Sequence, residues 1–120
     1  MAPVPRNRWL EVEHIGDVTV VRFAQGSILE EEMIQVMGRQ LFDLVENFGC
    51  RKFVVNFGNV RRVATMMVGK LLALHRKVQS GGGRLVICTI IPELREIFEI
   101  LKLSQLCSLY EDEQEALQSF

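Results

Sequence analysis

Two apolar runs, KFVVNF at residues 52–57 and RLVIC at residues 84–88, decide the fold of this chain. Both have the length and the Val and Ile content of buried strands, and a segment with helical periodicity lies between them. A right-handed crossover of this kind makes the two strands parallel and places the loop after the first strand at the carboxyl edge of the sheet. That loop and the helix start contain Val-Ala-Thr-Met-Met at residues 63–67. We therefore expect the side chains at this edge to decide what the protein does.

The N-terminal half predicts a hairpin and one helix. Residues 9–13 and 18–23 have strand patterns on either side of a turn, which indicates a β-hairpin. Ser27 and Glu30 have the spacing of a capping box, so a helix is expected to follow and to end at Gly49. The apolar stripe of this helix is expected to cover one face of the sheet and contains Met33, Met37, Leu41, Leu44 and Phe48, with Ile34 and Val45 beside them.

The C-terminal half predicts two more helices and a short strand. Three glycines at residues 81–83 precede a strand instead of following one, which is typical of a helix end and not of a phosphate-binding loop. Pro92 is expected in the first turn of the next helix. A last strand is expected within 106–110, and Asp112 is expected to cap a terminal helix. The apolar stripe of the Pro92 helix contains Leu94, Ile97, Phe98 and Leu101.

These elements predict a single α/β domain over residues 9–120. At 120 residues and 48% hydrophobic side chains, the chain has enough apolar material for one core. The expected architecture is a mixed, mostly parallel central sheet with an N-terminal hairpin and about four helices. Residues 1–8 contain two prolines and are expected to form a flexible lead-in.

Composition argues against several classes of function. A net charge of -1 predicts no general attraction to nucleic acid. The chain has no run of about 18 uncharged apolar residues, so no direct membrane insertion is expected. Cys50, Cys88 and Cys107 are odd in number and lack metal-site spacing, which favours reduced thiols in a cytoplasmic protein. His14 and His75 have no predicted neighbours that would complete an acid-base pair, so we predict no catalytic residue, metal or cofactor.

Four stretches carry a family resemblance: FGNVRRVATMMVGKLL at residues 57–72, GGRLV at 82–86, the helical pattern at 94–103 and LYEDEQEAL at 109–117. Together they resemble a STAS domain, the fold shared by anti-sigma factor antagonists and sulfate transporter tails. The resemblance covers nearly the whole chain. Its most specific parts are the order of the elements and the apolar register of the 57–72 stretch.

In antagonists of this family, the functional loop carries an Asp, then a phosphorylatable Ser or Thr. In this chain Ala64 takes the place of the Asp and Thr65 that of the phosphoacceptor. The resemblance implies a noncatalytic regulatory module that docks a kinase-type anti-sigma factor, or a related STAS or signalling protein, through residues 63–69. It also implies a switch by phosphorylation of Thr65. The residues expected to contact the partner are Arg61, Arg62, Ala64, Thr65, Met66 and Gly69.

Simpler interpretations of these residues remain open. The Thr65 hydroxyl is also suited to cap the helix that follows it. The adjacent arginines, Arg61 and Arg62, are also typical of a solubilising turn. Met67 has core spacing, whereas Met66 is the better candidate for a contact. The alternative functions are a constitutive scaffold or transporter-associated STAS subunit without phosphoregulation, and a sensor of a small ligand at the same edge.

Overall fold

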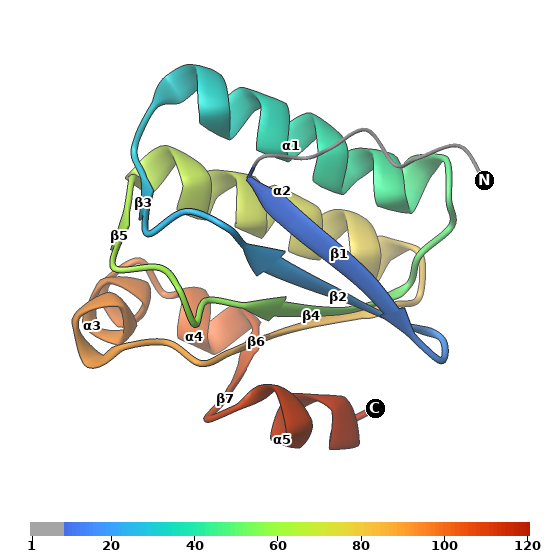
Figure 1. The fold of residues 1–120 in the computed structure, drawn as a ribbon. Helices are drawn as coiled ribbons and strands as arrows, with labels where there is room; N and C mark the ends of the chain where they lie inside the picture. The colour runs from blue at the N-terminus through green and yellow to red at the C-terminus, as the bar shows by residue number, and fades with distance from the viewer. Residues whose placement is uncertain (1–8) are drawn as a thin grey trace.

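The computed structural model describes residues 9–120, so the lead-in predicted for 1–8 lies outside the described residues. Within 9–120 the central sheet has five strands in the order β1-β2-β4-β6-β7 (Figure 1). Strand β1 is antiparallel to β2, and every other neighbouring pair is parallel. This confirms the predicted hairpin and the mixed, mostly parallel sheet. The strands are β1 (Leu10–Ile15), β2 (Val18–Phe23), β4 (Lys52–Asn56), β6 (Arg84–Cys88) and β7 (Ser108–Tyr110).

Helices cover both faces of the sheet. Figure 1 shows α1 and α2 side by side on one face and α5 on the other. The described residues form five helices instead of the predicted four or so, because one turn, α4, separates α3 from β7. The helices are α1 (Glu31–Glu46), α2 (Thr65–Ser80), α3 (Pro92–Ile100), α4 (Leu103–Leu106) and α5 (Glu113–Gln118).

The middle residues of β4 and β6 are apolar because both faces of these strands are buried. Alternate residues of a strand point to opposite faces. In β4, Phe53 and Val55 belong to the core under α1 and α2, whereas Val54 belongs to the smaller core under α5. Parallel pairing with β6 places Leu85 beside Phe53 and Val86 beside Val54. Two layers of packing therefore hold the carboxyl ends of these strands in place.

The prediction for the start and end of α1 was wrong in two respects. Ser27 does not cap the helix, because it lies in the two-residue strand β3 (Ser27–Ile28), and the N-cap is Glu30 without a side-chain cap bond. The helix ends at Glu46, and Gly49 lies beyond it with a φ of +66°. Phe48 is consequently outside the apolar stripe and is 70% exposed.

The C-terminal predictions are largely confirmed. Pro92 occupies the first turn of α3, and the Asp112 carboxylate accepts the Glu115 amide at 2.8 Å. Within the glycine triplet, Gly82 adopts a φ of +82°, as a left-handed helix end requires. In the α3 stripe, Leu94 and Phe98 are buried, whereas Ile97 is 37% exposed at the edge of the stripe.

His75 is a buried polar residue of α2. Burial, aided by the Arg76 charge, lowers the pKa of His75 from its ordinary 6.5. The unfolded chain therefore binds a proton at this residue more readily than the folded one, so stability is full above pH 6.5 and falls as the pH drops below it.

We expect His75→Leu to flatten the dependence of melting temperature on pH between 7.5 and 5.5. His14→Gln, at an exposed histidine, is the matched control, and an equal slope for wild type and His75→Leu would contradict the prediction.

Candidate functional site

The chain leaves the carboxyl end of β4 through a tightly bonded turn. The side-chain oxygen of Asn56 accepts the Gly58 amide at 2.7 Å, and the Val60 amide donates to the carbonyl of Phe57 at 2.9 Å. The side chain of Asn59 donates to the backbone of Phe23 at 3.0 Å. Two asparagines thus shape this turn, in the way that short amide side chains commonly do.

The segment after the turn was predicted to be a loop. In the structure it is part of a small second sheet. Strand β5 (Arg62–Val63) pairs in parallel with β3, which precedes α1. The amides of Arg61 and Arg62 donate to the Gly26 carbonyl at 2.8 and 3.2 Å, and the Ala64 amide donates to the Ile28 carbonyl at 2.8 Å. These bonds hold the start of α2 against the start of α1 at one edge of the molecule (Figure 1).

Thr65 is the first residue of α2 and not its cap, so the capping interpretation is wrong. The N-cap is Ala64, whose backbone is extended and whose carbonyl accepts the Met67 amide at 2.9 Å. No described side chain caps this helix, and its first turn contains no acidic residue. The positive end of the α2 dipole is therefore not balanced by a carboxylate of its own first turn. Thr65 itself is exposed there.

The exposed side chains at the α2 start share one helical face. Met66 is 39% exposed, and the next methionine, Met67, is fully buried, as predicted. Gly69 lies four residues after Thr65 and three after Met66, so it lies next to both of them on the helix surface. Apart from its chain neighbours and the nearby backbone of its own helix, no atom of the described residues lies within 4 Å of the position where a Gly69 side chain would begin. Arg61 and Arg62, which precede this helix in the chain, are also exposed, whereas Ala64 is half-buried and packs against the core.

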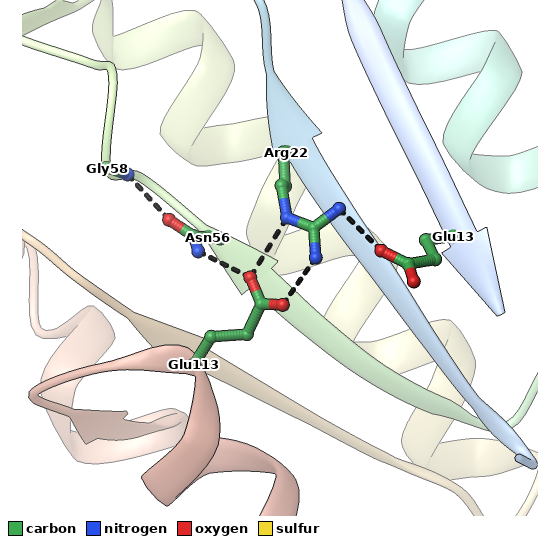
Figure 2. A network of polar contacts seen from close by, with 5 residues as sticks. All are labelled: Glu13, Arg22, Asn56, Gly58 and Glu113. Atoms are coloured by element: carbon green, nitrogen blue, oxygen red, sulfur yellow. Dashed lines mark hydrogen bonds and ion pairs between the residues drawn. The ribbon is translucent and has the colours of Figure 1, made fainter. Parts of the chain in front are cut away.

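A polar network at the same end of the sheet was not predicted (Figure 2). The guanidinium of Arg22 donates to Glu113 through Nε at 3.0 Å and through Nη2, and to Glu13 through Nη1 at 2.8 Å. Asn56 also donates to Glu113, at 2.7 Å. The Arg22 bond holds the pKa of Glu113 below its ordinary value, and Glu113 raises the pKa of Arg22. In the sequence, the charged residue Arg22 within the mostly apolar β2 could have indicated this network.

The described residues offer contact surfaces more readily than reactive groups. Burial raises the pKa of Cys107 to about 11 and also raises that of Cys88, so both thiols stay protonated at neutral pH. Nowhere in residues 9–120 do three His, Cys, Asp or Glu side chains gather in a way that would hold a metal ion. None of the helices formed by these residues has the length and apolar character that a membrane crossing requires.

Comparison with known proteins agrees with this architecture. The family model described as STAS domain matches residues 10–116. A putative anti-sigma factor antagonist from Thermotoga maritima is 16% identical, with a TM-score of 0.82 and 92% of each chain covered. The phosphorylated form of the Bacillus cell fate determinant SpoIIAA is 17% identical, with a TM-score of 0.73 and coverage of 92% of this chain and 97% of that one.

A chain from the stressosome, described as a signal integration and transduction hub, is 14% identical with a TM-score of 0.70, and the match covers 91% of this chain and 94% of that chain. At these identities the structures establish a shared fold. The family model adds a match over most of the sequence, including the turn and α2 start described above. The chain therefore belongs to the STAS domain family.

Proposed function

We propose that this chain is a noncatalytic regulatory module that docks a kinase-type anti-sigma factor, or a related signalling protein, through the start of α2. The observation that carries the proposal is the exposed face formed by Thr65, Met66 and Gly69 at an uncapped helix N-terminus. The likeness of the fold to anti-sigma factor antagonists supports this class of partner. We also propose a cytoplasmic location, because a kinase partner would need ATP as its phosphate donor.

Phosphorylation of Thr65 would change this surface without requiring a change of fold. A phosphate adds roughly two negative charges at the first residue of α2. The uncompensated helix dipole and the neighbouring Arg61 and Arg62 favour negative charge there. A partner surface built for the unmodified threonine would lose its complementarity. The folded domain would then persist while docking fails.

A constitutive scaffold or transporter-associated subunit is the second candidate, and two residues favour it. Ala64 stands where antagonists carry an acidic residue, and the exposed Met66 supplies an apolar contact in place of a small polar one. The stressosome chain offers a precedent for this fold within a larger assembly. Incubation with the partner kinase and ATP, followed by intact-mass measurement, separates the two functions, because a scaffold without phosphoregulation gains no phosphate on Thr65.

Docking itself is tested by placing a charge on Met66. We expect Met66→Asp to weaken binding to the purified kinase-type anti-sigma factor by at least about tenfold, because the aspartate would be desolvated at the contact. An acidic residue in the first turn suits the helix dipole, so folding should be preserved. Isothermal titration calorimetry measures the change.

Phe48→Asp is the control for this test. Phe48 is a 70% exposed apolar residue that follows the C-terminus of α1, at the opposite edge of the sheet. Its replacement is expected to leave the affinity unchanged. Equal weakening by Met66→Asp and Phe48→Asp, or no weakening by either, would count against docking through the α2 start.

A further inference from the structure

The network in Figure 2 connects α5 to the turn that leads to the docking edge. Asn56 stands at its centre, at the end of β4. Its Nδ2 donates to the Glu113 carboxylate at 2.7 Å, while its Oδ1 accepts the Gly58 amide at 2.7 Å. Glu113 is 91 residues away from Arg22, its other partner, and 57 residues from Asn56. A residue near the C-terminus therefore contacts the β4 turn directly.

The Glu113 carboxylate determines how the Asn56 amide is oriented. A carboxylate accepts hydrogen bonds and donates none, so it selects the NH2 group of the asparagine. The oxygen is then left facing Gly58, whose amide needs an acceptor. In the reversed orientation, oxygen would face carboxylate and NH2 would face N–H, so both bonds would be lost. Arg22 holds Glu113 through two guanidinium nitrogens, which fixes the carboxylate in turn.

The Gly58 amide bond begins the path to the α2 start. The turn it closes continues into Arg61 and Arg62, whose amides bond to Gly26, and then into β5 and Ala64. Gly58 also packs closely, because a side chain there would begin 3.0 Å from Oδ1 of Asn56 and 3.4 Å from the methyl group of Thr89. Thr89 has a φ of +62°, an uncommon backbone conformation for a β-branched residue, which indicates that the surrounding contacts constrain this corner.

We propose that Glu113 is a positioning residue for docking: by orienting the Asn56 amide, it sets the turn at 58–62 and thereby the presentation of the arginines and Thr65. This inference rests on the proposed function, to which it adds a contribution from α5. Contacts made on the α5 face of the sheet would then affect affinity at the α2 start through Glu113.

The test uses the 120-residue chain and two readouts. The first is the exchange rate of the Gly58 amide proton by NMR, which needs no partner. We expect Glu113→Ala and Asn56→Ala each to speed this exchange by about threefold or more. The second is affinity for the kinase-type anti-sigma factor, expected to fall about fivefold in each variant and no further in the double variant, because the two residues act in series.

Two further variants separate positioning from a general weakening of the C-terminus. Glu113→Gln keeps a side-chain oxygen that can accept from Asn56, so it should restore most of the Gly58 protection. Arg84→Ala removes the bonds to the Ser119 carbonyl at 2.7 Å and to the Tyr110 hydroxyl at 2.9 Å. It loosens the far end of α5 without touching Asn56 and should leave both readouts within about twofold of wild type.

Unchanged Gly58 exchange in Glu113→Ala would overturn the inference, as would equal losses of affinity in Arg84→Ala and Glu113→Ala. A wild-type chain that binds no such partner would refute the proposed function, and with it the docking role of Glu113. In that case Gly58 exchange still decides whether Glu113 positions the turn.

Discussion

A Gly83→Ala variant is expected to lose about 3 kcal/mol of unfolding free energy, at the upper end of the usual cost of overpacking. The added carbon would begin 2.0 Å from the carbonyl oxygen of Arg51 and 2.8 Å from its carbon. Both are backbone atoms, so rotation of a side chain cannot relieve the clash. The same oxygen accepts the Arg84 amide at 2.8 Å, next to the β4–β6 pairing. Moving it away would cost that hydrogen bond as well.

Urea denaturation followed by circular dichroism measures this loss, with Gly69→Ala as the matched control. Gly69 lies on an exposed helix surface with open space around it, so alanine there should stabilise the domain by about 0.5–1 kcal/mol. The two substitutions add the same methyl group at opposite ends of α2. A loss below about 1 kcal/mol in Gly83→Ala would mean that the loop accommodates a side chain, contrary to this geometry.

The glycine triplet illustrates what local sequence patterns can predict. Three glycines before a strand indicated a helix end, and the left-handed Gly82 confirms this. The special requirement at Gly83 was not accessible from the pattern, because it depends on Arg51, which β-strand pairing brings close from a distant part of the chain. Periodicity reports the face of an element that is buried, whereas close backbone contacts depend on the neighbours that the fold supplies.

The candidate site shows the same division between local and long-range information. The exposure of Thr65 and Met66 and the burial of Met67 agree with helical spacing. The capping interpretation of Thr65 failed by one residue, because Ala64 is extended and takes the cap position. Ser27 is a residue type that commonly caps helices, but in the structure it lies in β3 and pairs with Arg62 of β5.

The link between Arg22 and Glu113 spans 91 residues, and no spacing rule connects them. Each residue alone is only partly informative. Arg22 is a charged residue in a mostly apolar strand, and Glu113 follows the Asp112 cap of α5. Topology supplied the rest, because the antiparallel hairpin and the return of the chain through β7 bring both residues to the same face of the sheet.

Thr65→Glu is expected to weaken docking to the kinase-type anti-sigma factor by about 100-fold, because an unpaired charge would be buried at the contact. The same substitution should raise fold stability slightly. Glutamate has a higher helix propensity than threonine, and its charge lies at the positive end of α2, where no first-turn carboxylate competes. Calorimetric titration measures the affinity, and thermal unfolding of the free protein measures the stability.

Thr65→Val separates the added charge from the lost hydroxyl, since valine has nearly the shape of threonine without its oxygen. We expect this variant to bind within about fivefold of wild type, because Thr65 is exposed and a single neutral hydrogen bond contributes about 1 kcal/mol. If Thr65→Glu binds as tightly as Thr65→Val, charge at this position does not control docking, and the phosphorylation switch loses its physical basis. Opposite changes in affinity and stability for Thr65→Glu are the specific signature of a negative charge that suits the helix and excludes the partner.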